Sequence, residues 1–120
     1  MKMTRLVIVS VSLMSAMLFS PPAVQFARAD LTVKEFMVIR DTSYFNYYIS
    51  GLYQGFRLAN SSLSATNRKM LFCVPDAMTV DSAQLGSLLE DTIHAHQFEA
   101  DVQVEPILLM ALQETFSCSN

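Results

Sequence analysis

The N-terminal segment constrains this chain most, because it predicts both the size and the chemical environment of the folded domain. Residues 1–29 begin with two basic residues, continue with a mostly apolar run from 6 to 19, and end in a small-residue pattern at Ala29. This order is typical of a secretory signal peptide that is cleaved after Ala29. A retained membrane anchor is the alternative, but the apolar run is shorter than the roughly 20 residues that span a bilayer. We therefore expect residues 30–120 to form one small domain outside the cytoplasm.

Cleavage would also make the domain acidic. It removes Lys2, Arg5 and Arg28, which leaves five basic residues against eleven acidic ones and lowers the formal net charge from −3 to −6. An acidic domain is poorly suited to nucleic acid or to an anionic membrane surface, and it is better suited to a basic protein partner. We expect no nucleic-acid ligand, and no membrane association after cleavage.

The chain has two cysteines, Cys73 and Cys118. In an oxidising compartment, two cysteines in a domain of this size most simply form a disulfide. Closing the chain between them would stabilise the fold by about 4 kcal/mol on the chain-entropy model. A metal or redox role is disfavoured, because no second thiol or histidine lies at ligand spacing from either cysteine.

Capping patterns and apolar spacing predict an all-α domain, a compact bundle of about four helices clamped by one disulfide. Thr32 with Glu35, and Asp81 with Gln84, each match the capping box that starts a helix. Pro106 is tolerated only in the first turn of a helix, which places the start of the last helix just before it. The expected helices run from Thr32 to about Arg40, from Tyr44 to about Leu58, from Asp81 through Ile93, and from between Val102 and Glu105 to Phe116.

Small residues interrupt the predicted second helix at regular spacing. Gly51, Gly55 and Ala59 share one helical face with Tyr44 and Tyr48. Glycine inside a helix costs up to about 1 kcal/mol relative to alanine, so we expect another chain segment to approach this face closely. Packing of a helix from the same chain is the preferred interpretation, and a dimer contact is the alternative.

The polar segment 60–69 is predicted to be an exposed connection between the second and third helices. It holds Arg68 and Lys69, two of the five basic residues that follow the signal peptide. A solvated loop without function is the alternative, yet binding residues are frequent on loops whose ends are fixed, and Cys73 would fix one end here. The candidate partner-binding residues are Ser64, Asn67, Arg68 and Lys69.

No set of residues with the spacing of a known catalytic site is present. His94 follows Glu90 and Asp91 on the third predicted helix, which could form a partial metal site, but a solvated charged face is the preferred interpretation. We therefore expect a binding protein, with no enzymatic activity, no cofactor and no bound metal.

Three motifs occur in an order that resembles a known family. They are YISGLYQGFRLAN at 48–60, LFCVPDAMTVDSAQLGSLL at 71–89 and ILLMALQETFSC at 107–118. Together they resemble the Tai-type (Rap/Tai) family of periplasmic immunity proteins, which protect bacteria against type VI secretion amidase effectors. The resemblance covers residues 44–118, and the cysteines of its motifs match Cys73 and Cys118.

The resemblance implies a periplasmic, α-helical protein, commonly a homodimer, that occupies the active-site cleft of a cognate peptidoglycan amidase. This chain departs from the family pattern, because it lacks a second cysteine pair and has Gln97 and Ser117 where many members have proline. The alternative function is that of a periplasmic helical chaperone or stress-response protein with no dedicated toxin partner.

Overall fold

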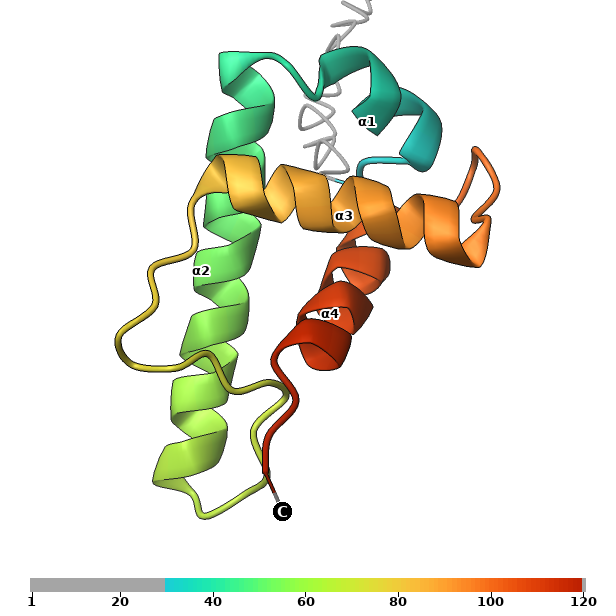
Figure 1. Cartoon of the computed structure of the whole chain (residues 1–120). Helices are drawn as coiled ribbons and strands as arrows, with labels where there is room; N and C mark the ends of the chain where they lie inside the picture. Colours follow the sequence, from blue (N-terminus) through green and yellow to red (C-terminus); the bar gives the residue numbers. More distant parts are fainter. Residues whose placement is uncertain (1–29, 120) are drawn as a thin grey trace, which may run out of the picture.

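Four helices form the domain, and they confirm the predicted all-α class. The computed structural model describes residues 30–119, so the predicted signal peptide (1–29) lies outside the described residues. Within 30–119 the structure contains no strand and only one isolated bridge, between Thr32 and Gln103. The helices are α1 (Val33–Ile39), α2 (Ser43–Ala65), α3 (Ser82–His96) and α4 (Val104–Thr115). In the view of Figure 1, α3 crosses in front of α2 and α4.

Hydrogen-bonded caps place the helix starts where the sequence predicts them. Both capping boxes are formed, by Thr32 with Glu35 before α1 and by Asp81 with Gln84 before α3. The main-chain and side-chain hydrogen bonds from Thr32 also lower the pKa of Glu35. At α4 the structure shows no side-chain cap, and Pro106 occupies the first turn, as expected for a residue without an amide N–H.

The prediction that α2 ends near Leu58 is wrong, because the helix continues to Ala65. The polar residues of 60–65 lie mainly on the exposed side of the helix. The helix can therefore continue there without a stripe of apolar residues. Two hydroxyls also bond back to the helix, Ser61 Oγ to the Arg57 carbonyl at 3.1 Å and Thr66 Oγ1 to the Ser62 carbonyl at 3.0 Å. The connection to α3 therefore spans 66–81 instead of starting at residue 60.

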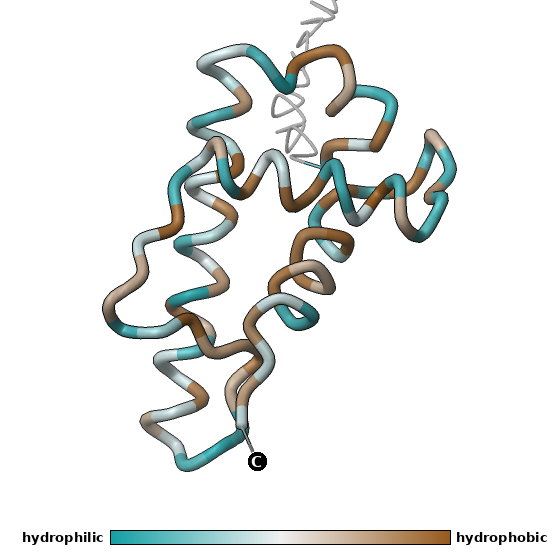
Figure 2. Tube along the Cα trace, viewed as in Figure 1, coloured by the Kyte–Doolittle hydropathy of each residue, from teal (hydrophilic) through white to brown (hydrophobic). Residues whose placement is uncertain are grey.

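The hydrophobic core lies where α3 packs against α4 and α2. Figure 2 shows that apolar residues are dense on α1 and α4, whereas α2 is mixed along its length. The rings of Phe36 on α1 and Phe45 on α2 belong to the core and lie 5.1 Å apart. Complete burial of a large apolar side chain contributes about 1.5–3 kcal/mol. The largest fully buried side chains are Phe36, Phe45, Phe72, Ile49, Leu85, Leu89, Ile107, Leu108, Leu112 and Val104.

The prediction that Gly51, Gly55 and Ala59 pack closely against another helix of the same chain is also wrong. All three are exposed, and a Cβ added at either glycine would meet nothing within 4 Å. The buried face of α2 instead carries larger residues, Phe45, Ile49 and Tyr53. Close approach occurs at Gly86 of α3, where an added Cβ would lie 3.2 Å from the Phe45 ring.

The disulfide between Cys73 and Cys118 is present, as predicted. The two Cα atoms lie 4.9 Å apart, across a sequence separation of 45 residues. The amide N–H of Cys73 also donates a hydrogen bond to the carbonyl of Phe116 at 2.7 Å. The chain end after α4 is thus fastened to the segment that leads into α3.

Candidate functional site

The predicted partner-binding residues lie together at the C-terminal end of α2. Ser64 belongs to the last turn of the helix, and Asn67, Arg68 and Lys69 follow it. All four residues are exposed. We call residues 64–69 the α2 tip. The structure therefore brings the four candidate residues to one place, on a helix end and the turn after it instead of along a ten-residue loop.

The conformation of the α2 tip is set by a helix-ending motif. Asn67 has φ 53°, in the left-handed region that favours glycine and asparagine after a helix. Its N–H donates to the Ser64 carbonyl at 3.0 Å, and the N–H of Arg68 donates to the Leu63 carbonyl at 2.8 Å. These two bonds form a Schellman motif, which satisfies carbonyl groups that the helix end would leave unpaired. An asparagine two residues after the last helical residue is the sequence signal that could have located this end.

Asn60 fixes the chain where it returns from the α2 tip. Its side-chain amide donates to the Phe72 carbonyl at 2.7 Å, and its side-chain oxygen accepts from the Leu71 N–H at 2.7 Å. Sequence reasoning assigned Asn60 to the polar connection and missed this role. With the disulfide at Cys73, the two bonds hold the chain that follows the α2 tip, while α2 itself holds the other end.

Charge is unevenly distributed along the chain. Arg57, Arg68 and Lys69 lie in or near the α2 tip and make up three of the five basic residues after residue 29. Residues 82–119, which include α3 and α4, contain six carboxylates and no lysine or arginine. The α2 tip is therefore a locally basic site on an acidic domain, and such asymmetry orients a charged partner as it approaches.

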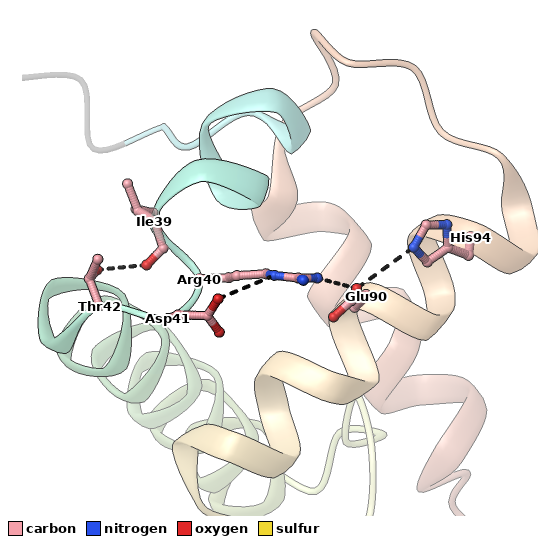
Figure 3. Close-up of polar contacts among 6 residues, drawn as sticks. All are labelled: Ile39, Arg40, Asp41, Thr42, Glu90 and His94. Carbon is pink, nitrogen blue, oxygen red and sulfur yellow. Dashed lines mark hydrogen bonds and ion pairs between the residues drawn. The ribbon is translucent and has the colours of Figure 1, made fainter.

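The possible metal site at Glu90, Asp91 and His94 is not assembled. Figure 3 shows Glu90 between Arg40 and His94, with the Arg40 guanidinium donating to the Glu90 carboxylate. His94 Nε2 lies 3.8 Å from Glu90 Oε1, and Asp91 is exposed. In the part of the chain that the structure describes, no three histidine, cysteine or acidic side chains converge in a way that could hold a metal ion. Glu90 instead links the end of α1 to α3.

Glu105 is a partly buried carboxylate that sequence reasoning treated only as a helix-start residue. Its Oε1 accepts hydrogen bonds from the Leu31 N–H at 2.9 Å and from the Tyr48 hydroxyl, whereas Oε2 is buried with no partner among residues 30–119. Burial, followed by the hydrogen bond to Glu105, raises the pKa of Tyr48 far above its ordinary value. Glu105 thereby fastens the start of the domain to α2 and α4.

One face of α2 is exposed although it carries large apolar groups. Tyr44, Tyr47 and Leu58 are 65%, 80% and 72% exposed, respectively. They lie at helical spacing with Gly51 and Gly55, and we call these five residues the α2 outer face. Exposed apolar side chains that share one helical face can serve as a contact surface for another protein.

Two further observations bear on the class of protein. Within 30–119, none of the helices combines the length and the hydropathy needed to cross a membrane. Comparison with models of known protein families, with curated proteins and with solved structures finds no match to this chain.

Proposed function

We propose that this protein is a periplasmic immunity protein, which binds and inhibits a peptidoglycan amidase toxin delivered by type VI secretion. The sequence motifs at 48–60, 71–89 and 107–118 support this proposal through their resemblance to the Tai-type family. The structural observation that carries it is the α2 tip, a small, exposed and basic projection that is held at both ends. The protein acts by binding, and it catalyses no reaction itself.

The fixed geometry of the α2 tip suits it to inhibition. Ordering a mobile side chain or loop on binding costs about 0.5–1.5 kcal/mol for each immobilised side chain, and a preorganised segment avoids part of that cost. The Schellman motif, Asn60 and the Cys73–Cys118 disulfide order the tip before any partner arrives. Arg68 and Lys69 would contact acidic groups of the toxin, while the acidic remainder of the domain favours a partner with a basic surface elsewhere.

The α2 outer face supports a homodimer as the functional form. Gly51 and Gly55 leave space for a second helix to approach the backbone of α2 closely. Tyr44, Tyr47 and Leu58 flank the glycines and would lose exposed apolar surface on contact. Antiparallel packing of two copies of α2 would bring the same residues together on both sides of a two-fold axis.

A periplasmic chaperone is the second candidate function, and the same exposed residues favour it. Tyr44, Tyr47 and Leu58 could contact apolar segments of unfolded clients. A chaperone would bind many unrelated proteins, and we expect that capture to increase as acidification dissociates a dimer and exposes apolar surface. An immunity protein would bind one toxin tightly at neutral pH.

The test is to measure binding of the oxidised, exported protein to a panel of periplasm-targeted amidase toxins. We expect nanomolar affinity for one toxin, together with loss of its activity. The double variant Arg68→Ser/Lys69→Ser should weaken that binding at least tenfold, whereas the matched control Lys34→Ser, on the exposed surface of α1, should not. Binding to no amidase, with capture of many unrelated proteins at low pH, would replace the proposal with the chaperone function.

A further inference from the structure

A groove runs between α2 and the segment 70–80, which returns beside it. Its volume is about 860 Å³, within the range of about 300–1,000 Å³ that is common for small-ligand sites. Tyr53, Gln54 and Arg57 line it from α2, and Val74, Asp76 and Met78 line it from the returning segment. We call this feature the α2 groove. In Figure 1 the returning segment is the olive loop beside the lower half of α2.

Tyr53 is the first sign that the α2 groove accommodates a ligand. The residue is only 5% exposed, and its ring stacks on Phe72 with 6.3 Å between centroids. Its hydroxyl has no hydrogen-bond partner among residues 30–119, and it is not one of the atoms shielded from solvent. Because this hydroxyl reaches solvent at the groove and bonds to nothing in the described part of the domain, it is available to a molecule in the groove.

The second sign is a pair of opposite charges on the two walls. Arg57 lies on α2 and Asp76 on the returning segment, both are exposed, and neither forms an ion pair with any residue in 30–119. A ligand with one positive and one negative group could contact both walls at once. Asn60 also lines the groove, but its amide is already bonded to the main chain of 71–72.

We propose that the α2 groove binds a short free peptide in its zwitterionic form. The peptide carboxylate lies against Arg57, its ammonium group lies against Asp76, and one of its backbone amide groups bonds to the Tyr53 hydroxyl. Met78 and Val74 contact its apolar side chains. A singly charged metabolite would use only one wall, and an internal segment of a protein has no free termini to offer. This proposal does not rest on toxin inhibition.

The test is an NMR titration of the isotopically labelled, oxidised, exported protein with tetra-alanine. We expect saturable shifts of the backbone amide signals around Tyr53, Arg57 and Asp76. The same peptide with an acetylated N-terminus and an amidated C-terminus should bind at least about tenfold more weakly, since it lacks both charges. Equal affinity for the two peptides, absence of saturable shifts, or shifts confined to residues 66–69 or to the α2 outer face would overturn the proposal.

Substitutions then separate a ligand site from a structural groove. Tyr53→Phe keeps the ring and removes only the unpartnered hydroxyl, so we expect an unchanged spectrum of the free protein and about fivefold weaker binding. Arg57→Gln and Asp76→Asn should each weaken binding of tetra-alanine several-fold without changing binding of the capped peptide. The control Lys34→Gln, on the exposed surface of α1 and outside the groove lining, should bind as the wild type does. Wild-type affinity in both Tyr53→Phe and Arg57→Gln would contradict the assignment.

Discussion

Removal of the Cys73–Cys118 disulfide should destabilise the protein more than any single surface substitution. The bond closes a segment with a sequence separation of 45 residues. On the chain-entropy model, a loop of this length lowers the entropy of the unfolded chain by about 13 cal/mol/K, which is about 4 kcal/mol at 25 °C. A domain of this size has a total stability of about 5–13 kcal/mol, so the double variant Cys73→Ala/Cys118→Ala should keep only part of it.

Equilibrium unfolding in urea measures this loss. With a urea dependence of about 1–2 kcal/mol/M for a small domain, the midpoint should fall by about 2–4 M relative to the oxidised wild type. Ser117→Ala is the matched control, because it changes an exposed residue beside Cys118 and should shift stability by less than about 0.5 kcal/mol. Hydrogen exchange should also accelerate at 70–73, where the bond holds the returning chain.

A midpoint change below about 0.5 M would refute the reasoning, since about 1 kcal/mol or less would remain for the bond. Such a result would mean that Asn60 and the core fix the returning segment without the covalent link. If the double variant is unfolded even without urea, the bond contributes nearly the whole stability of the domain. That contribution would lie at the upper end of the measured range for native disulfides.

Four further substitutions test particular contacts. Gly55→Ala should stabilise the monomer by about 0.5–1 kcal/mol, because an added Cβ meets nothing. Gly86→Ala should destabilise it, because the added Cβ would lie 3.2 Å from the ring of Phe45, which is fully buried and has little room to move. Urea midpoints that rank the two variants in the opposite order would refute the packing described. Asn60→Ala should lower the free energy of unfolding by about 2 kcal/mol, because it leaves two main-chain groups unpaired. The control Ser61→Ala should change it negligibly. Equal urea midpoints for the two variants would show that Asn60 does not hold the returning chain. The pKa of Tyr48 is higher in the folded protein than in the unfolded chain, so its contribution to stability is complete below pH about 10, where the phenol of the unfolded chain is still protonated. The free energy of unfolding should therefore fall above that pH. Tyr48→Phe should make this fall less steep, and an unchanged slope would contradict burial of the phenol.

The helix starts and the disulfide could be predicted because their determinants are local or compositional. Thr32 and Asp81 are each followed by the partner of a capping box, and both boxes are present. Pro106 restricts the start of α4 to the residues just before it, and the helix begins at Val104. Two cysteines allow only one intramolecular pairing.

The end and the orientation of α2 could not be predicted by the same means. Serines in 61–64 favour a turn when they are considered alone, but in the structure they extend a helix whose end is set by Asn67. Helical spacing identified one face of α2 with Gly51 and Gly55, yet the burial depends on Phe45, Ile49 and Tyr53, which follow an equally regular spacing. Periodicity gives candidate faces, and only tertiary packing decides which one is buried.

The tertiary contacts of the candidate site could not be predicted, because they join residues that are distant in the sequence. The polar sequence predicts that the four tip residues are exposed, and all four are exposed in the structure. The tip is ordered by contacts from Asn60 to Leu71 and Phe72, which lie 11 and 12 residues later in the sequence. Contacts at this separation follow no local sequence pattern. Glu105 likewise bonds to Leu31 and Tyr48, which are distant in the sequence.

The most direct measurement of the central claim is residual amidase activity as a function of added protein. For the cognate toxin, we expect loss of peptidoglycan cleavage at one binding site per toxin molecule, and at least tenfold weaker inhibition by Arg68→Ser/Lys69→Ser than by the Lys34→Ser control. Full activity of every periplasm-targeted amidase at saturating protein would contradict the proposed function. Inhibition that is equal for the tip variant and the control would contradict the role assigned to the α2 tip.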